Sequence, residues 1–165
     1  MLLEMRVFAL AVDPFMNVPI IILKDESTQN VLPIWIGPLE ASAIATELEK
    51  IQLTRPMTHD LLKEIFKSLR ITVSKIEITD IEDNVYYARI HLVSGDNHHS
   101  VDARPSDAIA VAMRTNAPIF VDQKVLEKSR NIDIKKGTDK DTDRQVQWLE
   151  MLSNLSPEDF GKYKM

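Results

Sequence analysis

Two similar stretches of the sequence contain residues that can bind a phosphate group. Arg55-Pro56 is followed by Thr58, His59 and Asp60, and Arg104-Pro105 is followed by Ser106 and Asp107. Each stretch predicts an arginine before a helix, a hydroxyl at the N-cap and an aspartate in the first turn. Helix N-termini carry unpaired N–H groups and a positive dipole end, and an arginine beside them can bind a phosphate through two hydrogen bonds. We therefore predict phosphate binding by Arg55 and Arg104.

Carboxylates near these helix starts suggest metal-assisted chemistry. Glu40 lies in the first turn of a helix opened by Gly37-Pro38, and it would join Asp60 and Asp107. Together the three carboxylates would hold Mg²⁺ or Mn²⁺, which activates a bound water. His59 would act as a general base, or would bind a phosphate when charged. The alternative interpretation is purely structural, because acidic residues commonly complement the dipole in a first helical turn.

The composition limits which partners and chemistries are possible. The 165 residues carry a net charge of −5, and residues 1–121 hold 11 Lys or Arg against 16 Asp or Glu. A polyanion would therefore have to be recognised by local charge rather than by a basic stripe. The absence of cysteine excludes disulfides, thiolate metal sites and thiol nucleophiles. No apolar run approaches the ~20 residues that span a bilayer, so we expect no membrane association and a cytoplasmic location.

Hydrophobic patterning predicts the elements that position these residues. Strands are expected at 5–12, 18–24, 31–36, 71–81, 85–94, 97–103 and 118–121, and helices at 38–51, after Pro56, at 106–115 and after Asp122. Pro33 favours an edge position for its strand. The apolar phase slips between Val73 and Ile76, which indicates a β-bulge.

The hairpin around Gly95-Asp96 has a register that the sequence itself favours. A two-residue turn pairs Ile90 with Val101 and places Arg89 opposite Asp102, whereas a three-residue turn would pair apolar with polar positions.

These patterns predict an α+β fold with a mixed, mostly antiparallel sheet of about six strands, packed helices and a C-terminal helical tail. The domain is expected at 1–129. Residues 130–165 are expected to form a linker and a tail whose helix starts at the capping box Thr142-x-x-Gln145. This tail would pack on the domain or on a second subunit, making the protein a homodimer or higher homo-oligomer.

Three separated strings resemble the bifunctional nuclease domain family. They are Pro33 to Ala41 (PIWIGPLEA), Arg55 to Leu61 (RPMTHDL) and Asp102 to Ala110 (DARPSDAIA), and the C-terminal LSPEDFGKY is also similar to bacterial members. The resemblance covers about residues 5–125. It implies a mixed α/β domain, DNase and RNase activity, and self-association.

Our leading hypothesis is a nuclease that hydrolyses phosphodiester bonds in DNA and RNA. Glu40, Asp60 and Asp107 would hold the divalent cation, His59 would transfer a proton, and Arg55 and Arg104 would bind the substrate phosphate. The alternative is a non-catalytic regulatory module in which the same helix starts bind a phosphorylated ligand or a partner protein.

Overall fold

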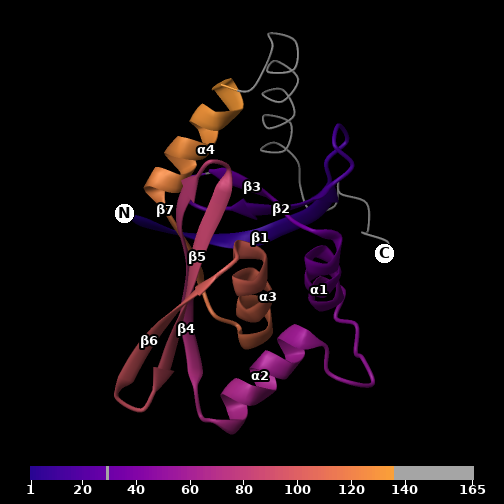
Figure 1. The fold of residues 1–165 in the computed structure, drawn as a ribbon, viewed down its shortest axis with the longest axis vertical. Coiled ribbons are helices and arrows are strands. Elements are labelled where there is room, and N and C mark those ends of the chain that lie inside the picture. Colours follow the sequence, from indigo (N-terminus) through magenta and orange to yellow (C-terminus); the bar gives the residue numbers. More distant parts are fainter. Residues whose placement is uncertain (29, 136–165) are drawn as a thin grey trace.

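The computed structural model describes residues 1–28 and 30–135 (Figure 1). The expected tail helix lies outside the described residues. Within them the chain forms seven strands and four helices, in the order β1 (Leu2–Val12), β2 (Pro19–Lys24), β3 (Val31–Trp35), α1 (Pro38–Leu48), α2 (Thr58–Ser68), β4 (Thr72–Glu82), β5 (Val85–Ser94), β6 (Asn97–Ala103), α3 (Pro105–Thr115), β7 (Ile119–Asp122) and α4 (Gln123–Lys135).

One sheet joins all the described strands in the order β3-β2-β1-β7-β4-β5-β6. Every neighbouring pair is antiparallel except β4 and β7, which run parallel. The α+β class and the mostly antiparallel sheet are confirmed, with seven strands rather than about six. The short strand β7 lies in the middle of the sheet, so the two halves of the domain meet along it.

Strand β1 belongs to both halves of the sheet and bends between them. Its first residues, Leu2 to Met5, pair with β7, and residues from Arg6 onward pair with β2 across a register shift near Val7. A bulge increases the local twist of a strand, so the sheet coils around its helices. The coiling brings Tyr86 of β5 to β3, where its hydroxyl donates to the Pro33 carbonyl at 3.3 Å.

The edge position expected for the Pro33 strand is confirmed, because β3 forms one edge of the sheet. Its neighbour β2 is the most deeply buried strand, with Ile20 to Leu23 fully inaccessible. A strand enclosed on both faces reads as a continuous apolar run, which is the pattern seen at 18–24.

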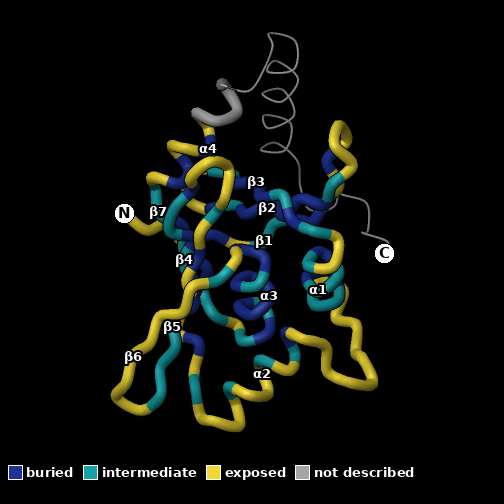
Figure 2. Tube along the Cα trace, in the orientation of Figure 1, coloured by how far each residue is buried: buried dark blue, intermediate teal, exposed yellow. Residues whose placement is uncertain are grey.

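Helices α1, α2 and α3 lie together against one face of the sheet, with α3 between the other two (Figures 1 and 2). Residues 108–112 of α3 are all buried, as its uniformly apolar sequence predicts. Helix α2 packs less closely than its apolar spacing suggested. Leu62 and Phe66 contact the core, while Leu61, Ile65 and Leu69 are 50%, 41% and 62% exposed.

The β4-β5-β6 meander follows the predicted registers. The bulge expected between Val73 and Ile76 occurs as a register shift between Val73 and Lys75. The two-residue turn at Gly95-Asp96 is confirmed, with Ile90 opposite Val101 and Arg89 opposite Asp102. Gly95 adopts φ +58, a backbone conformation that glycine reaches without steric cost.

Helix α4 extends further than the sequence suggested. Residues 130–135, expected to begin a linker, form the last turns of this helix. Lys124 and Lys128 hold the start of the helix against β4 by binding opposite oxygens of Asp80 at 3.0 and 2.6 Å. These hydrogen bonds, from Lys128 first, hold the pKa of Asp80 well below its ordinary value. No helix within the described ranges is long and apolar enough to cross a bilayer.

The turn between β1 and β2 depends on one buried carboxylate. Asp13, only 4% exposed, accepts hydrogen bonds from the Phe15 and Met16 backbone N–H groups at 2.8 and 3.2 Å. Its other oxygen accepts from the Trp35 indole N–H at 2.7 Å. A single side chain therefore satisfies three donors and joins the turn to β3.

We expect Asp13→Ala to lower the free energy of unfolding by about 1–3 kcal/mol, because three partly buried donors lose their acceptor. Urea denaturation checks this. Asp96→Ala, in the exposed β5-β6 turn, is the control and should change stability by less than about 0.5 kcal/mol. Equal effects of the two substitutions would contradict the role assigned to Asp13.

Candidate active site

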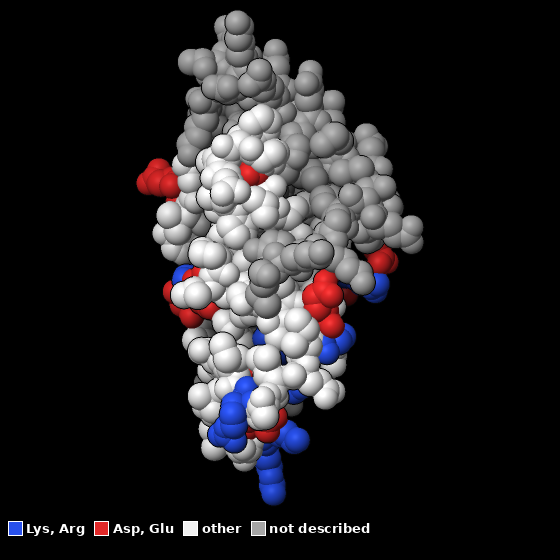
Figure 3. Space-filling view, turned by 90° about the vertical axis from the view of Figure 1, so that its right-hand side faces the viewer, with Lys and Arg blue, Asp and Glu red and all other residues white. Residues whose placement is uncertain are grey.

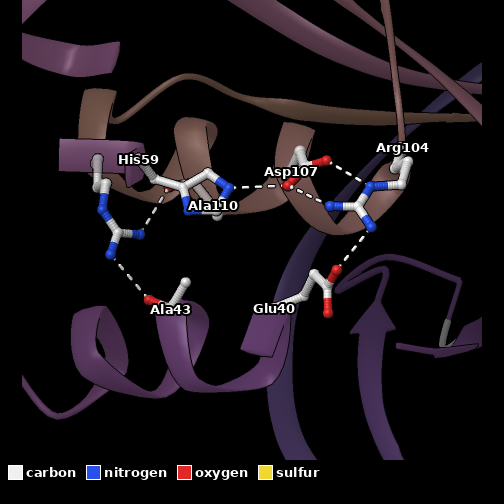
Figure 4. Close-up of polar contacts among 7 residues, drawn as sticks. Glu40, Ala43, His59, Arg104, Asp107 and Ala110 are labelled. Atoms are coloured by element: carbon white, nitrogen blue, oxygen red, sulfur yellow. Dashed lines mark hydrogen bonds and ion pairs between the residues drawn. The ribbon is translucent and has the colours of Figure 1, made fainter. Parts of the chain in front are cut away.

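The first turns of α1, α2 and α3 meet at one junction (Figure 4). Glu40 lies in the first turn of α1, His59 and Asp60 in that of α2, and Asp107 in that of α3. Arg104 precedes α3 directly after β6 and connects Glu40 with Asp107. Five of the six residues predicted from the sequence therefore lie on neighbouring helix starts, although they come from segments 64 positions apart.

Arg104 bridges two carboxylates. Its Nη1 donates to Glu40 Oε1 at 2.6 Å, while Nε and Nη2 donate to Asp107 Oδ2 and Oδ1 at 2.7 and 3.2 Å. These hydrogen bonds, from Asp107 first and then Glu40, raise the pKa of Arg104. The Arg104 side chain is 64% exposed, whereas Glu40 and Asp107 are 18% and 29% exposed. The arginine thus covers its partners and faces solvent itself.

Asp107 also binds the imidazole of His59. The distance from His59 Nε2 to Asp107 Oδ1 is 2.9 Å, and the histidine side chain is 11% exposed. Burial alone would raise the pKa of Asp107, but hydrogen bonds from Arg104 and His59 outweigh it and hold that pKa below its ordinary value. Asp107 is therefore an anion that fixes the orientation of the histidine ring.

The Glu40 side chain bends back over Gly37, the N-cap residue of α1. A side chain added at Gly37 would collide with the Glu40 carboxylate, so glycine leaves the space that the carboxylate occupies. Pro38 at the first helical position then sets the direction of α1. The Gly37-Pro38-x-Glu40 pattern thus places Glu40 within reach of Arg104.

Asp60 pairs with a different arginine, Arg114 of α3. It binds the Nε of Arg114 at 2.7 Å through one oxygen and accepts the Met57 backbone N–H at 3.0 Å through the other. Burial would raise the pKa of Asp60, but the hydrogen bonds from Arg114 and Met57 lower it overall. Asp60 therefore closes the N-terminus of α2 and pairs with an arginine of α3.

Arg114 is the residue of this junction that the sequence analysis did not identify. Its side chain is only 2% exposed, and besides Asp60 it donates to the carbonyls of Ala110 at 3.1 Å and Ala43 at 2.9 Å. It therefore ties α1, α2 and α3 together. The sequence did contain a signal, a single arginine at the end of an otherwise apolar helix. A guanidinium buried with such a helix needs hydrogen-bond acceptors, so this arginine could have been expected to contact neighbouring segments.

Two local expectations were wrong, both about the helix caps. Met57 and Arg104 are the N-cap residues, and neither Thr58 nor Ser106 makes the expected cap. Pro105 has the φ of a helical residue, so α3 starts one position before Ser106.

Arg55, predicted as a second phosphate ligand, lies exposed in the α1-α2 loop and forms no ion pair with the described residues of the junction.

The junction does not fit a three-carboxylate metal site in this conformation. In residues 1–28 and 30–135, no three His, Asp or Glu side chains converge in an arrangement that could hold a metal ion. The Arg104 guanidinium bridges Glu40 and Asp107, and Asp60 is bound by Arg114. Metal binding by Asp60, Asp107 and Glu40 therefore stays a prediction.

Comparison with known proteins identifies the family to which this chain belongs. The chain belongs to the bifunctional nuclease domain family, which it matches over residues 21–133. An uncharacterized protein of Mycobacterium tuberculosis is 33% identical over 162 residues, covering 95% of this chain and 97% of that protein.

Plant relatives match a shorter part of the chain. Bifunctional nuclease 1 of Arabidopsis thaliana is 29% identical over 109 residues, 64% of this chain and 34% of the plant protein. Bifunctional nuclease 1 of Oryza sativa subsp. japonica is 28% identical over 109 residues, 33% of its length. The match thus spans about a third of these plant proteins.

The Arg114 contacts give a direct test of the junction. Asp60→Ala leaves a buried guanidinium without its anion, so we expect a loss of roughly 2–4 kcal/mol in the free energy of unfolding, measured by urea denaturation. Glu64→Ala, which removes an exposed acid from the same helix, should cost less than about 0.5 kcal/mol. If the two variants are equally stable, Asp60 does not hold Arg114.

The lowered pKa values of Asp60 and Asp107 predict a pH dependence of stability. Carboxylates with a depressed native pKa stabilise the fold above their unfolded pKa of about 3.9, and this contribution disappears as pH falls through the native values. The difference in unfolding free energy between wild type and Asp60→Asn/Asp107→Asn should therefore shrink as the pH falls below about 4. A difference that grows on acidification would contradict the assigned shifts.

Proposed function

We propose that this protein hydrolyses phosphodiester bonds in DNA and RNA at the junction of α1, α2 and α3. The observation that carries the proposal is that Arg104, Asp107 and His59 form one hydrogen-bonded chain from a solvent-exposed guanidinium to a shielded imidazole. Membership of the bifunctional nuclease domain family supports the reaction class.

Arg104 is the proposed phosphate ligand. Its bonds to Asp107 and Glu40 use three of the five guanidinium N–H groups. The side chain is the most exposed member of the junction, and the N-terminus of α3 begins directly beside it. A phosphate oxygen there would meet both the arginine and the positive end of the helix dipole.

His59 is the proposed proton-transfer residue. Because Asp107 binds Nε2, the other ring nitrogen, Nδ1, is the atom that would take a proton from the attacking water. The attack forms a phosphorus–oxygen bond and breaks the bond to the leaving alkoxide, which takes a proton from solvent. Asp107 would stabilise the protonated ring by its negative charge.

The surface charge supports placing substrate binding at this junction. On the face shown in Figure 3, Lys and Arg lie beside Asp and Glu and form no continuous basic stripe over the described residues. The substrate backbone therefore gains little from the overall field of a chain with net charge −5. Recognition would be concentrated at Arg104.

A second candidate function is a non-catalytic module that binds a phosphorylated ligand or a partner protein. The observation that favours it is that Glu40, Asp60 and Asp107 each bind an arginine. These ion pairs hold the side chains in fixed positions, as a rigid recognition site requires. A binding module would bind its phosphorylated ligand or partner protein without cleaving nucleic acid.

The test compares Arg104→Ala with Arg55→Ala in the full chain. The purified proteins are assayed on fluorescent DNA and RNA, with Mg²⁺, with Mn²⁺ and with chelator. Removing a prepositioned donor to the reacting phosphate should cost about 100-fold in rate or more. We expect this loss for Arg104→Ala, while Arg55→Ala should remain within about threefold of wild type.

His59→Asn and His99→Asn form the matched histidine pair for the same assay. His99 is exposed on β6, outside the junction. Cleavage that disappears with His59 and survives without His99 supports the proposed proton transfer. Activity unchanged in both Arg104→Ala and His59→Asn would assign the cleavage to a contaminant or to another site. Tight binding with no cleavage by wild type would favour the binding module.

A further inference from the structure

Helix α2 carries a row of exposed lysines beside the candidate active site. Lys63 and Lys67 follow His59 at intervals of four residues, and both are exposed, whereas His59 is buried. Four residues of an α-helix turn through about 400°, so each step moves the side chain about 40° around the helix axis. The row therefore starts at the shielded imidazole and reaches the surface along the helix. Arg70 adds a third exposed cation two residues after the helix ends.

These three cations have no carboxylate partner among the described residues. Four lysines elsewhere on the protein each bind the carboxylate of a nearby side chain: Lys50, Lys75, Lys124 and Lys128. Lys63, Lys67 and Arg70 form no such ion pair within residues 1–28 and 30–135. Their charge is therefore available to a ligand, whereas that of the other four lysines is already compensated.

The exposed surface of α2 is basic, although the chain as a whole has a net charge of −5. Asp60 is bound by Arg114, which leaves Glu64 as the one other acidic residue of the helix. Three cations thus stand beside a single free carboxylate. Lys and Arg gather at the lower end of the face shown in Figure 3, the end at which Figure 1 draws α2. An acidic chain can recognise a polyanion only through local charge of this kind.

The row continues the line of the candidate active site. Arg104, Asp107 and His59 follow one another across the junction, joined by hydrogen bonds of 2.7 and 2.9 Å (Figure 4). Lys63 and Lys67 lie beyond His59 along α2, and the eight residues from His59 to Lys67 span about 12 Å of helix. Each strand of a nucleic acid carries one phosphate per nucleotide, so a row of this length reaches a few phosphates of one strand.

We propose that Lys63, Lys67 and Arg70 bind the sugar-phosphate backbone of the strand that is cleaved at the junction. Arg104 takes the reacting phosphate, and the row on α2 holds neighbouring phosphates of the same strand. Contacts of this kind fix the register of a nucleic acid and carry no base preference. The inference rests on the proposed function, because it extends the same substrate site from the junction along α2.

An acidic partner protein is the other ligand to weigh, because Leu61 and Ile65 are also exposed on α2. Protein interfaces place their charges around an apolar centre. Leu61 and Ile65 precede Lys63 and Lys67 by two residues, which puts them about 200° away, on the opposite side of the helix. The lysines are therefore not the rim of that apolar surface. Their row leads instead to His59, which favours the nucleic-acid strand.

Fluorescence anisotropy of the full chain with a labelled single-stranded DNA oligonucleotide tests the row. Binding is measured in chelator over a range of salt concentrations, and the oligonucleotide is recovered afterwards to check that it is intact. Each lost phosphate contact makes the slope of log K against log salt shallower by about 0.7. We expect Lys63→Gln/Lys67→Gln to reduce the slope by about 1.4 and to bind roughly tenfold more weakly at about 100 mM salt. Adding Arg70→Gln should reduce the slope further.

Arg6→Gln/Lys24→Gln is the matched control, because it removes the same net charge from paired positions of β1 and β2. Its slope should equal that of wild type. Glu64→Gln removes the carboxylate beside the row and should bind more tightly than wild type, and weaker binding would contradict the proposal. Equal slopes for the two double variants would overturn it. An unchanged slope in Lys63→Gln/Lys67→Gln would also overturn it and would favour an acidic partner protein on α2.

Steady-state cleavage separates this inference from the proposed function. The phosphates held by the row do not react, so the double lysine variant should raise KM and leave kcat within about twofold of wild type. Salt-dependent binding through the row without cleavage by wild type would retain the row and refute the nuclease. Cleavage with an unchanged KM in the double lysine variant would retain the nuclease and overturn the row.

Discussion

The buried guanidinium of Arg114 is the constraint on which the helical half of this protein depends. A charge that is 2% exposed must be neutralised and hydrogen-bonded, and its acceptors come from three different helices. The carbonyl of Ala43 sets the distance between α1 and α3, and the carboxylate of Asp60 sets the start of α2. Helix α2 contributes little apolar burial beyond Leu62 and Phe66, and this polar contact adds a second constraint on its placement.

The burial of Arg114 also gives the two similar Arg-Pro motifs different structural roles. Asp60 and Asp107 occupy equivalent positions in the sequence pattern, but Asp60 pairs with a buried arginine and Asp107 with an exposed one. The difference follows from the position of each arginine on α3. Arg114 lies in the last turn, inside the helix layer, while Arg104 lies before the first turn, at the surface. One aspartate therefore supports the junction, and the other shares an arginine that a ligand can reach.

Much of the fold could be predicted because local patterns carry it. Pro33 marked an edge strand, the phase slip after Val73 marked a bulge, and the alternation around Gly95-Asp96 fixed a hairpin register. Each of these signals depends on neighbours within a few residues. The apolar spacing in α2 said less about packing. Helical periodicity shows that Leu61, Ile65 and Leu69 share a face of the helix, but it does not show what covers that face.

The sequence by itself determined most of the elements, the register of the β5-β6 hairpin and the side chains proposed to bind a phosphate, because these follow from periodicity, turn chemistry and residue type. Only the tertiary structure decided how those side chains pair. Glu40 and Arg104 are 64 positions apart, and Asp60 and Arg114 are 54 apart, so no local pattern connects them. The coiled sheet and the packing of α1 and α2 on α3 bring them together, and the cost of burying a charge without a partner then selects the pairs.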